Sequence, residues 1–495
     1  MKMSKKILLV VLVIIAVFLS GLVGNTVINT SKYQKKITDQ LACYESSALA
    51  DINSEKAVSD LSKALQYETI YSYDKSKVNE SEFIKMHNFL DSEFPNIRNK
   101  LSKEIINKYS LLYKWEGEDD SEAIILLAHM DVVGGNEKTD ADWNEPIFSG
   151  AVTDEYIYGR GALDIKGQLI SIFESVDQLV KEGYVPKKTV YIAVGHDEEL
   201  GGNEGNKEIV KRIQKEGKKI NAVLDEGGYI VKGIVPKDDK PDALVGVAEK
   251  GSVTLKISGN GKGGHSSMPE NNTAISTVSS AVAKLKKSPF KKEIISVTGE
   301  FLDNTAPMMP FISRLGIYNR GIFKPIITNM LSDSGSTNAL ITTTIAPTII
   351  HGGEEYNVIP DNCEVVINFR ILPGESVDSV KDQVSEYLKS ENVTVELYGS
   401  YWNSSKISDY NNESYKILQK TINKNFEDTM VAPYLVVGCT DSRYYQDICD
   451  NIYRFTPLVL EKDDLQRIHG VNERLSKDGY IKMIDFYYDL IKSMQ

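Results

Sequence analysis

The chain is poor in cysteine, histidine and positive charge. Its 495 residues include only four Cys and six His, and 57 Lys+Arg face 69 Asp+Glu, giving a net charge of −12. So few cysteines exclude a disulfide scaffold, and the acidic balance argues against a nucleic-acid partner. Hydrophobic residues make up 41%, which excludes disorder as the main state. A chain of this length is expected to form roughly two to four domains.

One long hydrophobic run is present, at the N-terminus. Residues Ile7 to Gly24 are apolar except for Ser20, and three lysines precede them. As a helix this run would span roughly 27 Å, close to the thickness of a bilayer core. Because a short apolar core and a cleavage site are not clear, we predict an uncleaved membrane anchor at 1–28. The rest of the chain is then expected to be extracytoplasmic, and secretion after cleavage is the alternative.

The following region has the pattern of an α/β fold. Apolar runs at 123–128, 189–194 and 222–224 alternate with helical patterns at 165–182 and 203–215. Strands that are apolar on both faces and alternate with helices predict a mostly parallel sheet flanked by helices. Ligands bind such sheets at the carboxyl ends of the strands.

The pattern changes near residue 247. The segments that follow are alternating strands at 253–257, 342–348 and 363–371, a helix at 273–287 and an irregular stretch at 305–325. This pattern predicts a smaller α+β domain inserted over 247–372. The catalytic domain would then consist of two parts, 29–246 and 373–495.

Two motifs of the α/β region contain an aspartate that could take part in metal binding. His129 and Asp131 end a buried strand, and residues two apart on a strand share a face. Asp131 could therefore accept the second N–H of a metal-bound His129; a satisfied core histidine is the alternative. Asp164 lies in a glycine-flanked loop before a helix, where it could bridge two cations or simply cap the helix.

Three further motifs carry carboxylates or histidine. Glu198 and Glu199 follow a buried strand, and Asp225 and Glu226 end the next one. Adjacent carboxylates repel unless a cation offsets them, so we predict that one of the first pair binds metal and the other moves protons. A solvated acidic loop is the alternative for that pair. His469 lies far downstream in the sequence and could be a further metal ligand. The alternative is a lone loop histidine without such a role.

Taken together, these motifs fit a dinuclear metal site. Two histidines and three or four carboxylates mostly lie at strand ends of one sheet. Imidazole and carboxylate ligands without thiolate favour two zinc ions per chain, with cobalt or manganese as possible substitutes. A water molecule shared by two such ions would have its pKa lowered toward neutrality.

From about residue 61 to the C-terminus, the same motifs resemble a family of dinuclear zinc peptidases and amidohydrolases. This family includes aminoacylase, carboxypeptidase S and the acetylornithine and succinyl-diaminopimelate deacylases. The resemblance is closest to the branch of carboxypeptidase S and the N-fatty-acyl amino acid hydrolases. It implies a zinc-exopeptidase-like fold whose inserted domain serves as a lid and allows a homodimer.

The resemblance also implies roles for the residues of the α/β domain. Glu198 matches the general base and Asp131 the partner of His129. The matching metal ligands are His129, Asp164, Glu199, Asp225 and His469. Asp164 would bridge the two ions, and Asp225 would lie beside His129.

Other matches concern the substrate. His265 resembles a lid histidine that polarises the scissile carbonyl, often from the other subunit of a dimer. Asn357 and Arg370 resemble residues of substrate-binding strands, and Arg370 would hold the substrate carboxylate through a bidentate contact. A surface ion pair is the alternative for Arg370. Gly438 and Thr440 resemble a glycine-rich substrate loop.

The activity implied is hydrolysis of an amide bond in short peptides or N-acyl amino acids that carry a free carboxylate. A zinc-bridging water would attack, with Glu198 as base. One alternative is an N-long-chain-acyl amino acid hydrolase or synthase, in which residues 308–323 could line the acyl pocket. The other is a catalytically inactive surface binding module; the expected residues at every motif position argue against it.

Overall fold

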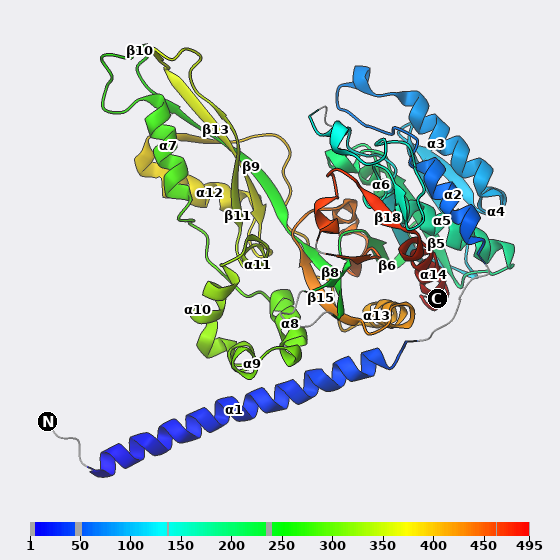
Figure 1. The fold of residues 1–495 in the computed structure, drawn as a ribbon, viewed down its shortest axis with the longest axis horizontal. Coiled ribbons are helices and arrows are strands. Elements are labelled where there is room, and N and C mark those ends of the chain that lie inside the picture. The colour runs from blue at the N-terminus through cyan, green and yellow to red at the C-terminus, as the bar shows by residue number, and fades with distance from the viewer. Residues whose placement is uncertain (1–4, 45–51, 136–137, 234–239, 462, 495) are drawn as a thin grey trace.

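The computed structural model describes residues 5–44, 52–135, 138–233, 240–461 and 463–494. Figure 1 shows a larger α/β body, a smaller sheet that extends away from it, and one long N-terminal helix along one side of the molecule. The expected division into an α/β body and a second, smaller α+β unit is therefore present.

The larger body is built on a ten-stranded mixed sheet. Its strands, in spatial order, are β1 (Ser102–Ile106), β2 (Ser110–Trp115), β5 (Lys188–Gly195), β3 (Asp119–His129), β6 (Lys219–Asp225), β16 (Ile452–Arg454), β8 (Pro241–Glu249), β7 (Ile230–Lys232) and β17 (Val459–Leu460), with β15 (Met430–Val436) paired to β8. The central strands β5, β3, β6 and β16 are parallel to one another, and the apolar runs predicted this for β3, β5 and β6. Antiparallel pairs involving β1, β2, β7 and β8 make the whole sheet mixed.

Helices cover this sheet, and β3 shows why its sequence is apolar throughout. Ile124 and Leu126 point into a core shared with helices, whereas Ile125 and Leu127 point into a second core on the other face. Helices of the first core are α2 (Ser54–Ala64), α3 (Glu80–Glu93), α4 (Pro95–Lys100), α5 (Lys166–Lys181), α13 (Glu413–Asn425) and α14 (Lys477–Ser493). Helix α6 (Asn206–Gln214) covers the second core.

The smaller sheet is antiparallel and extends further along the chain than predicted. Its strands, in spatial order, are β11 (Thr344–His351), β13 (Asn362–Ile371), β9 (Gly251–Asn260) and β14 (Thr394–Leu397), and helices α7 (Ala274–Leu285) and α12 (Val377–Leu388) share its core. The inserted unit therefore continues beyond residue 372, where the sequence analysis ended it. The amphipathic pattern of α12 does not reveal which of the two sheets it packs on.

Two further regions differ from the sequence-based expectation. The N-terminal helix α1 (Lys5–Leu41) continues well past the apolar run. The stretch 305–325, expected to be irregular, is largely helical. It belongs to a group formed by α8 (Ser296–Thr305), α9 (Phe311–Tyr318), α10 (Arg320–Leu331) and α11 (Gly335–Ala339). Pro310 precedes the first residue of α9, where a missing N–H removes no helical hydrogen bond.

Candidate metal centre

The candidate site forms where neighbouring parallel strands end. β3 ends at His129 and β6 at Asp225, and the acidic motif containing Glu198 follows β5. Asp164 comes from the loop before α5, and His469 from the loop before β18 (Arg474–Ser476). Because β18 pairs with β4 (Tyr156–Tyr158), these two distant loops are held side by side.

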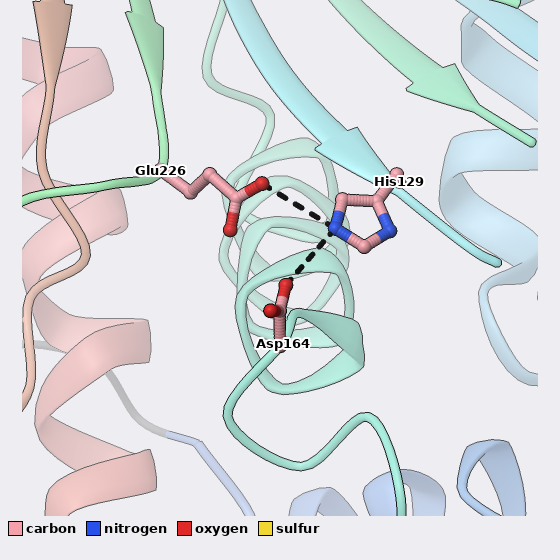
Figure 2. A group of neighbouring side chains, drawn as sticks. All are labelled: His129, Asp164 and Glu226. Atoms are coloured by element: carbon pink, nitrogen blue, oxygen red, sulfur yellow. Dashed lines mark hydrogen bonds and ion pairs between the residues drawn. The ribbon is translucent and has the colours of Figure 1, made fainter. Parts of the chain in front are cut away.

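The first group of possible ligands surrounds His129. Its Nε2 lies 3.2 Å from Oδ1 of Asp164 and 3.3 Å from Oε1 of Glu226. Figure 2 shows the two carboxylates turned toward this nitrogen. The imidazole is 1% exposed. One nitrogen and two carboxylate oxygens therefore converge within 4.8 Å of one another, a spacing that suits a single cation.

The second group shares Asp164 with the first. Nε2 of His469 lies 3.0 Å from Oδ2 of Asp164 and 3.0 Å from Oε2 of Glu199. The two oxygens of Asp164 thus face two different histidines. This is the arrangement expected of a carboxylate that bridges two cations. Asp164 does not cap the following helix, because the N-cap residue of α5 is Ile165.

Asp131 contacts both His129 and the backbone of the acidic turn that contains Glu198 and Glu199. Nδ1 of His129 lies 3.0 Å from the Asp131 carbonyl oxygen and 3.4 Å from its Oδ1. The same carboxylate accepts the backbone N–H groups of Glu198 at 3.2 Å and Glu199 at 3.1 Å. Because Asp131 is fully buried, it orients the imidazole and the acidic turn together.

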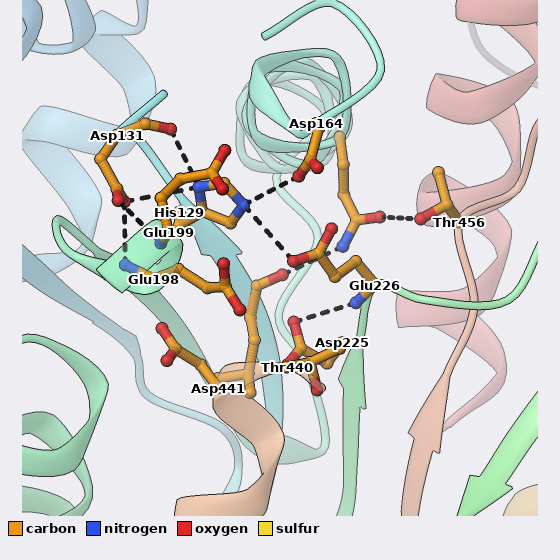
Figure 3. A network of polar contacts seen from close by, with 12 residues as sticks. His129, Asp131, Asp164, Glu198, Glu199, Asp225, Glu226, Thr440, Asp441 and Thr456 are labelled. Atoms are coloured by element: carbon orange, nitrogen blue, oxygen red, sulfur yellow. Dashed lines mark hydrogen bonds and ion pairs between the residues drawn. The ribbon is translucent and has the colours of Figure 1, made fainter. Parts of the chain in front are cut away.

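Glu226, and not Asp225, lies beside His129, which corrects the sequence-based assignment. The Asp225 carboxylate accepts the backbone N–H of Ser442 at 2.8 Å and that of Glu226 at 2.9 Å. Asp225 is the last residue of β6, and Glu226 already lies where the chain turns after the strand, so the two side chains point to different sides. Figure 3 shows the Glu226 carboxylate turned toward His129.

The cluster holds more carboxylates than its histidines can neutralise. Burial and neighbouring carboxylates raise the pKa of Glu198 and Glu226 well above the ordinary value. Burial acts in the same direction on the pKa of Asp164. The hydrogen bonds from His129 and His469 together have the larger effect, so the pKa of Asp164 lies below its ordinary value. Divalent cations would offset this excess of negative charge, and the imidazole nitrogens and carboxylate oxygens are ligands that zinc accepts.

A buried ion pair joins the two loops of the site. Nη1 of Arg160 lies 2.7 Å from Oε2 of Glu473, and both side chains are almost fully buried. Oε1 of Glu473 accepts the backbone N–H groups of Leu163 at 2.8 Å and Asp164 at 3.2 Å. The guanidinium also donates to the carbonyl of His469 at 3.3 Å. The sequence analysis assigned neither residue a role, because their contact spans more than 300 residues.

A cavity of about 720 Å³ adjoins the cluster. Its lining includes Glu198 and Glu199 from the larger body and Arg370 from β13 of the smaller sheet. Nη1 of Arg370 lies 3.6 Å from Sγ of Cys439, and no carboxylate among the described residues forms an ion pair with it. The surface ion pair considered for Arg370 is therefore absent from the described part of the chain.

The remaining predicted substrate residues fall in two places. Gly438 and Thr440 line the same cavity, although the N–H and hydroxyl of Thr440 bind the buried Glu249 carboxylate at 3.0 and 3.1 Å. His265 and Asn357 are exposed at the far tip of the smaller sheet, where β10 (Gly264–His265) pairs with β12 (Val358–Ile359) (Figure 1). The structure does not bring these two residues to the metal cluster of their own chain.

Comparisons with known proteins find relatives of this chain in sequence and in fold. Residues 125–493 match the model of peptidase family M20/M25/M40. The chain is 37% identical to probable carboxypeptidase S-like 2 of Dictyostelium discoideum, over 96% of this chain and 91% of that protein. It is 36% identical to the N-fatty-acyl-amino acid synthase/hydrolase of Xenopus tropicalis, over 90% and 87%. A crystal structure of an M20 family metallo-carboxypeptidase from Sulfolobus solfataricus shares the fold, with a TM-score of 0.66 at 15% identity, covering 88% and 98%.

Proposed function

Since this chain belongs to peptidase family M20/M25/M40, we propose that it is a hydrolase with two divalent cations that cleaves the amide bond of short peptides or N-acyl amino acids. The family match confirms the resemblance inferred from the motifs, and with it a metal-dependent hydrolase. The observation that carries the dinuclear proposal is Asp164, whose two oxygens face His129 and His469.

Each cation would have its own set of ligands. His129, Asp164 and Glu226 would hold one, and Asp164, Glu199 and His469 would hold the other. The absence of thiolate favours zinc, with cobalt or manganese as substitutes. When bound, the cations would supply a Lewis-acidic centre that lowers the pKa of a water molecule.

Glu198 is the proposed general base. Its half-buried side chain lies beside the cluster, where the loss of water contact raises its pKa well above the ordinary value. A carboxylate with a raised pKa can accept a proton from the attacking water and return it to the leaving amine near neutral pH. Asp131 holds the backbone of this residue in place and orients His129.

Arg370 is the proposed anchor for the free carboxylate of the substrate. It lines the same cavity as Glu198 and lacks an ion-pair partner among the described carboxylates. A guanidinium binds a carboxylate through two parallel hydrogen bonds. His265 would act on the substrate of a second chain in a homodimer; its exposure at the tip of the smaller sheet supports this arrangement.

Long-chain N-acyl amino acids are the second candidate substrates. The cavity has an apolar part formed by Val231, Leu244, Tyr434, Val436 and Leu465. The segment 308–323, once considered for this role, contributes none of the cavity's lining residues. An acyl chain would therefore lie along β15 and its neighbours, and the similarity to an N-fatty-acyl-amino acid synthase/hydrolase supports this possibility.

We propose that α1 is a retained membrane anchor and that the catalytic body is extracytoplasmic. α1 is the one helix of the described residues that is long and apolar enough to cross a membrane, with a mean hydropathy of 2.5 in its most apolar window. Its second half packs against the rest of the chain. Tyr33 donates to Glu300 at 3.0 Å, and Gln40 exchanges two hydrogen bonds with the backbone of Val431. Nδ2 of Asn25 also donates to a backbone carbonyl of the catalytic part at 2.9 Å. This contact supports retention, because cleavage near residue 28 would remove it while leaving the other two in place.

One experiment tests the proposed activity. The purified full chain is incubated with dipeptides, N-acetyl amino acids and N-long-chain-acyl amino acids, and amine release is followed with and without a chelator. We expect chelator-sensitive release and about two metal ions per chain. Glu198→Gln should abolish release while the metal content stays unchanged. Near-normal activity of this variant would refute the base assignment, and a parental chain without metal and activity would favour the inactive binding module.

A further inference from the structure

The helices α9 and α10 expose a row of large apolar side chains. In α10, Ile322, Ile326 and Met330 are spaced four residues apart and are 53%, 59% and 61% exposed. At the start of α9, Phe311 is 41% and Ile312 76% exposed. Residues four apart share one side of a helix, so α10 presents an apolar stripe to the surroundings. Large apolar side chains gathered in this way mark an interaction surface.

The charge of this segment is opposite to that of the whole chain. Residues 304–332 contain no Asp or Glu and three basic residues, whereas the chain carries a net charge of −12. Arg320 pairs with Asp303 at 2.6 Å, which leaves Arg314 and Lys324 as basic residues near the stripe. Asp303 and Asp333 flank this range, but α9 and α10 themselves carry basic and no acidic residues. Apolar side chains on helices of this charge fit the boundary between acyl chains and headgroups of a bilayer.

The corner between α9 and α10 contacts α1 where the apolar run ends. Nδ2 of Asn319 donates to the Leu22 carbonyl at 3.3 Å and to Oγ1 of Thr26 at 3.0 Å. Nδ2 of Asn25 donates to the carbonyl of Tyr318 at 2.9 Å. These bonds fix the height of the corner along α1.

The position of this corner along α1 agrees with the surface of a bilayer that α1 would cross. All side chains from Leu9 to Ser20 are exposed, and Leu22 is the first buried one. Leu22 follows Ile7 by a helical rise of roughly 22 Å, and a bilayer core is about 30 Å thick. If α1 spans the membrane, the α9–α10 corner lies close to the lipid–water boundary. In Figure 1 the N-terminal part of α1 extends past these helices, away from the larger body.

We propose that the face of α9 and α10 formed by Phe311, Ile312, Ile322, Ile326 and Met330 inserts into the bilayer surface as a second membrane contact beside α1. This inference rests on the proposed anchor. With α1 also bound to the enzyme at Tyr33 and Gln40, the catalytic body would be held at the membrane in one orientation and would not move on a flexible tether.

Tryptophan quenching tests this surface in the full chain. Ile326→Trp places a fluorophore on the stripe, and Ile105→Trp places one on β1, at an equally exposed site (56%) on the edge strand of the larger sheet. Both variants are reconstituted into phosphatidylcholine vesicles with and without brominated acyl chains. The emission of the three native tryptophans is subtracted with the parental chain.

We expect brominated lipid to reduce the added emission at position 326 by about half or more, and to leave that at position 105 unchanged. Equal quenching at both positions would overturn the proposal. A blue-shifted but unquenched emission from the Ile326→Trp variant would also overturn it, because the stripe would then be covered by protein, such as a second copy of the chain. If the parental chain does not float with vesicles, the anchor and the surface fail together, whereas flotation without quenching refutes the surface alone.

Discussion

Replacing Glu473 by leucine should disturb both loops of the metal centre at once. Its carboxylate pairs with Arg160 at 2.7 Å and accepts the backbone N–H groups of Leu163 and Asp164. Arg160 in turn donates to carbonyls of the loop that carries His469. The pair therefore links Asp164 to the loop that carries His469.

The contacts of this pair allow the loss of stability to be estimated for each variant, and they predict that the two single variants differ. Leaving a buried Arg160 without its carboxylate should cost about 3–5 kcal/mol, and each N–H group left without an acceptor adds about 1–3 kcal/mol unless water reaches it. Arg160→Met should cost less than Glu473→Leu. The remaining carboxyl group can take up a proton and still accept both N–H groups, whereas a guanidinium cannot lose its charge. The double variant should be more stable than Glu473→Leu alone, because no unpaired charge remains.

Urea unfolding of the detergent-solubilised full chain would measure these differences through tryptophan fluorescence. Trp115 is buried in the sheet of the larger body and reports on its unfolding. Metal content after dialysis provides a second readout, and we expect Glu473→Leu to retain less metal than Arg160→Met. The reasoning would be refuted if Glu473→Leu unfolded at the parental urea concentration with its metal retained. Equal losses in the two single variants would refute the asymmetry.

Three further predictions concern other parts of the molecule. Glu226→Gln should lower the metal content toward one ion per chain, whereas Asp225→Asn, its matched neighbour, should retain both ions; elemental analysis decides between them. Arg370→Met should raise KM for substrates with a free carboxylate by about tenfold to a hundredfold with a smaller change in kcat, because it removes a charge-assisted contact worth about 1.5–3 kcal/mol. Burial, followed by the charge of Arg370, lowers the pKa of Lys250 from its ordinary value of 10.5 to about 7. The unfolded chain therefore binds more protons between these pH values and stability rises with pH there; Lys250→Met should flatten this rise in urea midpoints measured from pH 7 to 10.

The centre of the fold could be predicted because its signals are local. β3, β5 and β6 are continuous apolar runs that end in charged motifs, and the parallel arrangement brings those ends together. The helices α9 and α10 could not be recognised in the same way. Their prolines, glycines and exposed apolar residues resemble an irregular segment when the packing against α1 is unknown.

The candidate site shows the same limit. His129, Asp164, Glu199 and His469 were all expected as ligands, and the structure brings them together. The choice between Asp225 and Glu226 depends on how the chain turns after β6, which two adjacent acidic residues do not reveal. The partnership of Arg160 with Glu473 depends on tertiary structure alone, since neither residue has a local pattern that points to the other.

The position of Arg370 relative to the metal cluster depends on how the two sheets are joined. β8 ends at Glu249 and β9 begins at Gly251, so Lys250 alone separates the larger sheet from the smaller one. Nζ of Lys250 donates to two backbone carbonyls, at 2.9 and 2.7 Å. The returning chain runs beside this junction, where Ser252 and Trp402 exchange two backbone hydrogen bonds of 2.9 Å.

These contacts restrain two of the connections between the sheets at one point, the junction after β8 and the returning chain at Trp402. A substrate that binds Arg370 through its carboxylate and Glu198 at its amide bond, as proposed, would span this junction, so the contacts around Lys250 should help to set the separation of these two residues. Lys250→Met should for this reason alter more than the pH dependence of stability. Losing the two hydrogen bonds donated by Nζ should loosen the junction and raise KM for substrates that must reach both residues, without affecting metal content. An unchanged KM in this variant would indicate that the junction does not set the length of substrate that the cavity accepts.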